Sequence, residues 1–167
     1  MLVGIVSDTH DDLSAVDQAV ETFESRGVDT VIHCGDIVAP FAATPFDRSF
    51  AFHAVRGNND GEWALAQTID AFGTYHGEFA HLTLDDREFA VYHGTSEPIV
   101  EALLASGAYD YVCRGHTHER TLDDLSGTVE INPGGLPFPQ APADPAVAIL
   151  DTTAPVGPDA VETLSVS

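Results

Sequence analysis

Seven polar residues in the sequence carry the oxygen and nitrogen atoms that bind divalent metal ions. They are two aspartates, one asparagine and four histidines, spread over most of the chain: Asp8, His10, Asp36, Asn58, His93, His116 and His118. Carboxylate, imidazole and amide ligands without thiolates suit manganese, iron, zinc, nickel or cobalt better than a soft metal. These residue types therefore favour a site for divalent metal ions.

The spacing of these residues suggests how they would face an ion. Asp8 and His10 are two residues apart, as are His116 and His118. Since residues i and i+2 of an extended segment share a face, we expect each pair to face one ion, with Asp36 able to bridge two. Taken singly, each residue is also typical of an ordinary helix cap or loop. The combination of all seven residues indicates a metal-binding site.

Apolar segments precede each polar group and predict the elements that position it. Runs at 2–7, 29–34 and 50–55 predict strands, and a helical pattern after the first run closes at Gly27, which predicts a parallel βαβ arrangement. In such sheets ligands bind beyond the carboxyl ends of the strands, so we expect the seven residues at one edge. The rest of the chain predicts two hairpins (77–94 and 120–132), a helix (97–107), a strand (109–113), a proline-rich loop (132–145) and two final strands (146–151 and 160–166).

Five motifs in this order resemble the calcineurin-like metallophosphoesterases: DTH at 8–10, GD at 35–36, GNND at 57–60, HG at 93–94 and GHTH at 115–118. The short chain and the INPGG segment at 131–135 are most similar to the small archaeal and bacterial phosphodiesterase branch. The resemblance implies a single domain over residues 1–167, folded as a four-layer α/β/β/α sandwich of two mixed β-sheets flanked by helices. It also implies a phosphodiesterase acting on a small phosphoester.

The resemblance further implies how the seven residues divide between two metal ions. One ion would be held by Asp8, His10, Asp36 and His118, and the other by Asp36, Asn58, His93 and His116. Asp36 would bridge the ions, and His116 and His118 would bind different ones. A hydroxide between the ions would attack phosphorus, which makes Asp36, Asn58 and His93 the expected catalytic group. Manganese is the favoured metal, with nickel, iron, zinc and cobalt as alternatives.

Three positions depart from the family pattern. Asn59 stands where many members have histidine and the small branch often has cysteine, Gly135 replaces a common serine, and Asp11 replaces a glycine. Because an amide cannot act as a general acid, Asn59 implies slower turnover or an easy leaving group. A second function therefore stays open: a weak or inactive metal-binding module for protein interaction, as the retromer scaffold subunit is within this family.

Four residues beside the motifs are candidate contacts to substrate or to the ligands: Arg56, Asn59, Asp60 and Arg114. A guanidinium group suits phosphate oxygens, yet pairing with the abundant carboxylates is the favoured role for both arginines. Asp60 is expected either to orient a ligand histidine or to cap a turn. Trp63 is expected to pack into the core.

The charge balance limits the partners of the chain. It has 27 acidic and 6 basic residues, all six being arginine, and a net charge of −21. Such a chain lacks the basic surface needed for sequence-independent binding to nucleic acid or anionic membranes. Its negative charges repel one another, and because salt screens this repulsion, the composition suggests a halophilic protein. No apolar run is long enough to span a membrane and no signal peptide begins the chain, so we expect a cytoplasmic protein with buried free thiols at Cys34 and Cys113. A homo-oligomer is compatible with the sequence, although no apolar stripe requires one.

Overall fold

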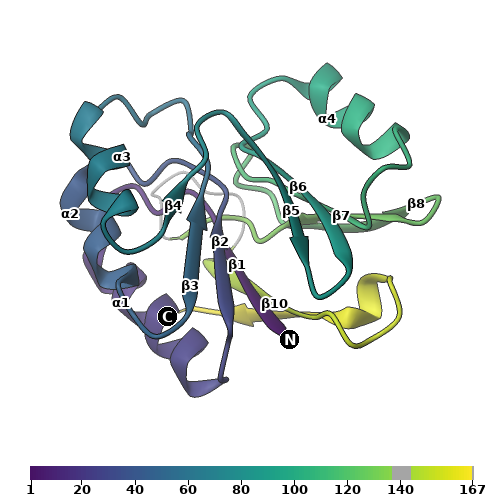
Figure 1. Cartoon of the computed structure of the whole chain (residues 1–167), viewed down its shortest axis with the longest axis horizontal. Helices are drawn as coiled ribbons and strands as arrows, with labels where there is room; N and C mark the ends of the chain where they lie inside the picture. The colour runs from purple at the N-terminus through teal and green to yellow at the C-terminus, as the bar shows by residue number, and fades with distance from the viewer. Residues whose placement is uncertain (137–143, 167) are drawn as a thin grey trace.

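Two mixed β-sheets lie face to face in the computed structural model, which describes residues 1–136 and 144–166 (Figure 1). The first sheet has the strand order β11-β10-β1-β2-β3-β4 and the second has the order β5-β6-β7-β9-β8. The strands are β1 (Leu2–Val6), β2 (Thr30–His33), β3 (Ala51–Ala54), β4 (Thr74–Tyr75), β5 (Phe79–Leu84), β6 (Arg87–Tyr92), β7 (Tyr111–Cys113), β8 (Thr121–Leu125), β9 (Thr128–Asn132), β10 (Ala146–Asp151) and β11 (Val161–Ser165). The helices are α1 (Leu13–Ser25), α2 (Pro40–Ala43), α3 (Trp63–Asp70) and α4 (Glu97–Ala105), with 3-10 turns at Thr44–Phe46 and Pro158–Ala160.

The first sheet begins with the predicted parallel βαβ unit. β1 pairs in parallel with β2, and α1 connects them. Asp12 caps the start of α1, because its carboxylate accepts a hydrogen bond from the backbone N–H of Ala15 at 3.0 Å. The helix ends at Ser25 with Arg26 as its C-cap, and Gly27 follows with φ of 67°, the left-handed conformation that glycine adopts after helices. These features confirm the predicted strand, helix and stop.

The second sheet contains both predicted hairpins. β5 and β6 pair antiparallel, as do β8 and β9, whereas β7 lies parallel to β6 and to β9. The antiparallel strand β10 returns to pair with β1 in the first sheet, so the two ends of the chain contribute to one sheet. The last strands are thereby confirmed.

Two apolar clusters make up the core. One apolar cluster, containing Phe23, Phe46 and Phe52, lies between the first sheet and its helices. The other, containing Ile5 and Phe89, lies between the two sheets. In Figure 1, α1, α2 and α3 stand on one side of the molecule and α4 on the other. The predicted α/β/β/α sandwich is confirmed.

Some local features differ from what the sequence indicated. The helices α2 and α3 and the short strand β4 were not predicted, and Trp63 is 77% exposed instead of packed in the core. Trp63 is the first residue of α3, and the residues of this helix that reach the core are Leu65 and Ile69. Part of the predicted loop, 137–143, lies outside the described residues. Cys34 and Cys113 are free and buried, as predicted, and none of the described helices is long and apolar enough to cross a membrane.

Candidate metal centre

The seven predicted residues all follow the carboxyl ends of strands, and the fold brings these ends together. β1 leads to Asp8 and His10, β2 to Asp36, and β3 to Asn58. From the second sheet, β6 leads to His93, and β7 leads to the segment with His116 and His118. Within each sheet the parallel strands bring their loops to one edge, and contacts such as Asp8 to His118 at 3.6 Å show that the two edges adjoin.

Asp8, His10 and His118 form the first ligand group. Asp8 Oδ1 lies 3.8 Å from His10 Nε2 and 3.6 Å from His118 Nε2, and the two imidazole rings stack with centroids 5.2 Å apart. Asp8 Oδ2 accepts hydrogen bonds from Ser7 Oγ at 2.6 Å and from the backbone N–H of His116 at 3.1 Å. Asp8 Oδ1 is buried and accepts no hydrogen bond from the described residues. A buried, negatively charged oxygen held beside imidazole nitrogens is what a divalent cation requires.

Asn58, His93 and His116 form the second candidate ligand group. The Asn58 Oδ1 atom lies 3.0 Å from His93 Nε2 and 2.9 Å from His116 Nδ1. The rings of His93 and His116 meet edge to face with centroids 5.3 Å apart. One amide oxygen and two imidazole nitrogens therefore converge on a common point, again with no thiolate.

A backbone carbonyl sets the tautomer of His93. His93 Nδ1 lies 2.7 Å from the carbonyl oxygen of Cys34, and because a carbonyl only accepts, this nitrogen carries a hydrogen. Burial lowers the pKa of His93, but the hydrogen bond to Asp36, the charges of Asp8 and Asp36, and the Cys34 carbonyl raise it above its ordinary value overall. When the ring is neutral, its lone pair is on Nε2, the atom beside Asn58 and Asp36, where it would bind a cation in place of the hydrogen bond to Asp36.

Asp36 lies between the two ligand groups. Its Oδ2 atom is 3.7 Å from His10 Nε2 and 3.4 Å from His93 Nε2. Burial favours the neutral acid, but hydrogen bonds from His93 and from the backbone N–H of Asn59 hold the pKa of Asp36 well below its usual range. Asp8 also approaches both groups, since its Oδ1 atom lies 4.0 Å from His93 Nε2. Asp36 Oδ2 therefore occupies the place between the groups where the family resemblance puts the bridging carboxylate, and Asp8 lies beside it.

The backbone at these residues is left-handed, not extended as the spacing rule assumed. Five of the seven have positive φ: Asp8 at 54°, His10 at 43°, Asp36 at 60°, His116 at 70° and His118 at 57°. Non-glycine residues in this region cost about 1–3 kcal/mol each and cluster at functional sites. Backbone hydrogen bonds from Asp8 to Gly35 and from His10 to Asp36 hold two of these turns. The extended backbone assumed for these pairs is therefore wrong. Asp8 and His10 still share one ligand group, as expected, whereas His116 and His118 lie in different groups.

Two glycines allow the loops to approach this closely. A Cβ atom on Gly115 would lie 1.8 Å from Ser7 Oγ and 2.3 Å from Asp8 Oδ2. A Cβ atom on Gly57 would lie 2.1 Å from Asp36 Oδ1. Any side chain at either position would displace a carboxylate of the centre.

Asp60 and Asn59 support Asp36 from behind. The carboxylate of Asp60 accepts hydrogen bonds from the backbone N–H groups of Asp36 at 3.0 Å, Val38 at 2.7 Å and Gly57 at 2.7 Å. It therefore orders two ligand loops, and among the described residues it accepts these hydrogen bonds from backbone groups and not from a histidine. Asn59 donates from its backbone N–H to Asp36 Oδ1 at 2.8 Å and from its side-chain amide to Asp36 Oδ2 at 2.7 Å.

Both candidate arginines are engaged with acidic residues. Arg114 is 7% exposed, its Nε atom lies 2.6 Å from Glu130 Oε1, and its Nη1 atom donates to Glu97 at 2.9 Å. Arg56 donates to Glu78 at 3.1 Å and to the carbonyl oxygen of Asp60 at 3.1 Å. These contacts match the favoured pairing role and leave Arg56, whose side chain is half exposed, as the more accessible of the two guanidinium groups.

Two supporting residues were missed from the sequence. Ser7 is fully buried and orients Asp8, and Asn132 donates to the carbonyl oxygen of Gly115 at 3.2 Å, which supports the GHTH loop. Their positions in the sequence, next to motifs, could have identified both. Ser7 directly precedes the first motif, and Asn132 opens the NPGG segment.

The remaining histidines lie outside the ligand groups. His33 is buried, and burial lowers its pKa to about 3, while its ring contacts Thr9 and the backbone N–H of Gly35. His53 and His76 contact each other at 3.0 Å, and His81 pairs with Glu88 on the surface.

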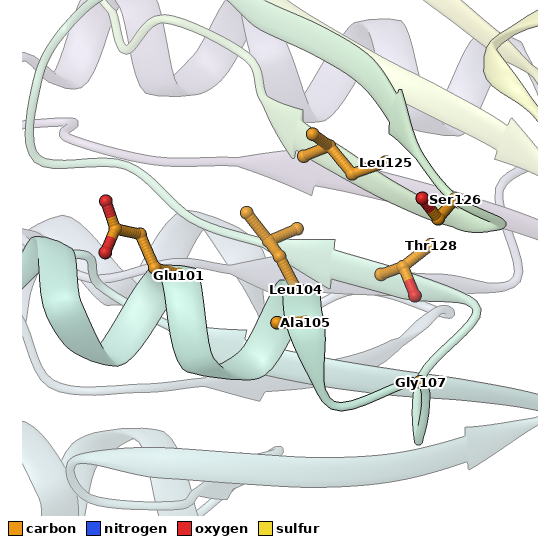
Figure 2. Close-up of a pocket in the computed structure, with 7 residues that line it drawn as sticks. All are labelled: Glu101, Leu104, Ala105, Gly107, Leu125, Ser126 and Thr128. Atoms are coloured by element: carbon orange, nitrogen blue, oxygen red, sulfur yellow. The ribbon is translucent and has the colours of Figure 1, made fainter.

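A separate cavity of about 480 Å³ lies between α4 and the β8–β9 hairpin. Figure 2 shows Leu104 of α4 and Leu125 of the hairpin on its facing sides. Thr128, which lines this cavity, begins β9, whereas His116 follows the end of the parallel strand β7. The cavity thus lies at the amino-terminal ends of these parallel strands, away from the metal centre at their carboxyl ends.

Comparison with known proteins agrees with this geometry. Residues 1–154 match the calcineurin-like phosphoesterase superfamily domain. A phosphodiesterase from Methanocaldococcus jannaschii is 38% identical over 156 residues, which cover 91% of this chain and 93% of that protein. The solved structure of an archaeal phosphodiesterase has a TM-score of 0.90 at 34% identity and covers 99% of both chains. A Zn²⁺ complex of Vps29 from Entamoeba histolytica, at 18% identity and a TM-score of 0.70 over the full length of both chains, shares the fold.

Proposed function

The chain belongs to the calcineurin-like phosphoesterase superfamily and is a metal-dependent phosphoester hydrolase, and we propose that it cleaves small phosphodiesters with two divalent metal ions. The observation that carries this proposal is the pair of ligand groups with the carboxylate of Asp36 between them. We assign Asp8, His10 and His118 to one ion, and Asn58, His93 and His116 to the other. Asp36 lies between them.

Two bound cations supply an activated water and neutralise charge on the phosphoryl oxygens. The residues of the chain hold this arrangement. Ser7 fixes Asp8 through one oxygen and leaves the other for a cation, and the Cys34 carbonyl fixes the ring of His93. Asn59 cannot donate a proton as a general acid, so we propose substrates with a good leaving group, such as aryl esters.

Further properties follow from composition. We propose manganese as the metal, because the donor set is oxygen and imidazole nitrogen without sulfur. We also propose a cytoplasmic, halophilic protein, since a net charge of −21 without any lysine is best tolerated where salt screens repulsion. A single domain over residues 1–167 is supported by the return of β10 to β1.

The test combines elemental analysis with hydrolysis of a chromogenic bis-aryl phosphodiester at high salt. We expect two ions per chain and metal-dependent turnover in the wild type. The double variant Asp36→Ala, His116→Ala should lose activity by at least about a thousandfold, whereas His81→Ala, which removes a surface histidine, serves as the control. Full activity in the double variant would overturn the proposal. A metal-loaded wild type that is inert across a panel of phosphoesters would favour the protein-interaction module.

A further inference from the structure

Asn59 contacts both carboxylate oxygens of Asp36. Its backbone N–H donates to Oδ1 at 2.8 Å, and its side-chain amide donates to Oδ2 at 2.7 Å. The Asp36 side chain is 2% exposed, and Asn59 itself is exposed at the edge of the centre. The two bonds differ in kind, because the first belongs to the turn of the chain and the second depends on the side chain at position 59.

The side-chain amide occupies the oxygen that faces both ligand groups. Asp36 Oδ2 lies 3.7 Å from His10 Nε2 and 3.4 Å from His93 Nε2, so it is the atom placed to join two ions. A carboxylate oxygen offers two lone pairs. An oxygen that bonds two cations uses both, and none remains for the Asn59 amide. Asp36 Oδ2 therefore cannot accept the hydrogen bond from the Asn59 side chain and bridge two cations at the same time.

We propose that Asn59 is a positioning residue whose side-chain amide holds Asp36 Oδ2 in the metal-free protein and releases it when the second ion binds, an inference that rests on the two-metal function proposed above. The backbone N–H of Asn59 keeps its bond to Oδ1, so the carboxylate retains its orientation during this exchange. Asn59 thus stabilises the buried charge of Asp36 before metal binding and competes with the second ion for it. This role needs a neutral donor and no proton transfer.

The test uses Asn59→Ala and the similarly shaped Asn59→Leu, both of which remove the donor. Gln67→Ala is the matched control, because it removes an exposed carboxamide from α3 without changing charge. Metal-free proteins are titrated with Mn²⁺ by calorimetry. We expect the second ion to bind about tenfold more tightly to both Asn59 variants than to the wild type, since a hydrogen bond to a charged group is lost only from the metal-free state.

Thermal unfolding supplies a readout that a merely structural role would not produce. Without metal, the Asn59 variants should unfold at a lower temperature than the wild type, and with saturating Mn²⁺ this difference should disappear. An equal decrease in both states, or a second ion bound no more tightly, would overturn the inference. A wild type that binds fewer than two ions would instead refute the two-metal function, so the two failures are distinguishable.

Discussion

The buried ion pair between Arg114 and Glu130 provides a quantitative test of what holds the GHTH loop. Arg114 is 7% exposed and Glu130 is 6% exposed, and their charged atoms lie 2.6 Å apart. Arg114 immediately precedes Gly115, and its backbone N–H donates to the carbonyl oxygen of Ile131 at 2.9 Å. The pair therefore ties the loop that carries His116 to the neighbouring strand β9.

Arg114→Met keeps much of the apolar stem but leaves the carboxylate of Glu130 buried without its partner. Removing one member of a buried pair costs about 3–5 kcal/mol. For a chain of this size, each kcal/mol lowers the midpoint of thermal unfolding by about 2–4 °C, which gives a decrease of about 6–20 °C. The double variant Arg114→Met, Glu130→Leu removes both charges and should recover most of this loss, because well-packed apolar residues often replace a buried pair at no cost.

The assay is unfolding by guanidinium chloride followed by far-ultraviolet circular dichroism, arranged as a double-mutant cycle. Arg26→Leu is the control, since Arg26 pairs with Glu162 on the surface and its removal should change stability little. A loss below about 1 kcal/mol for Arg114→Met, or no recovery in the double variant, would refute the reasoning. The guanidinium group of Arg114 would then be free for another role, including contact with substrate.

Three further outcomes are expected. Gly115→Ala should destabilise the protein by about 1–3 kcal/mol and weaken Mn²⁺ binding, because the new Cβ would overlap Ser7 Oγ; calorimetry showing wild-type affinity would contradict this. Burial, with the neighbouring imidazole, lowers the pKa of His53, and burial lowers that of His76, so stability should be full above the unfolded value of 6.5 and fall as pH drops below it. Unfolding midpoints at pH 7 and pH 5 should differ more in the wild type than in His76→Gln, and equal differences would exclude this pair. Raising KCl from about 0.1 M to about 1 M shortens the screening length from about 10 Å to about 3 Å and should raise the unfolding midpoint; an unchanged midpoint would remove the basis for the halophilic assignment.

The elements around the centre were predictable because their signals are local. Apolar runs of strand length and the pattern of α1 depend only on neighbouring residues, and they predicted β1, β2, β3 and both hairpins. The helix α3 was missed, because its buried residues, Leu65 and Ile69, are too few to form a periodic pattern. The exposure of Trp63 could not be predicted from the sequence either. A large aromatic residue predicts burial on average, but its place at the exposed start of a helix depends on the fold.

The sequence by itself determined the residue types of the centre, their order, and their place after strand ends. These are properties of short segments, and they were sufficient to predict the family and the α/β/β/α architecture. The family resemblance implied how the ligands divide into two groups, and only the tertiary structure decided the contacts that hold them. The left-handed turns at Asp8, His10 and Asp36, the amide of Asn59 on Asp36, and the pairing of Arg114 with Glu130 all depend on chain segments that the sheets bring together. Contacts between distant segments leave no local pattern, since their geometry arises from packing and not from the spacing of residues along the chain.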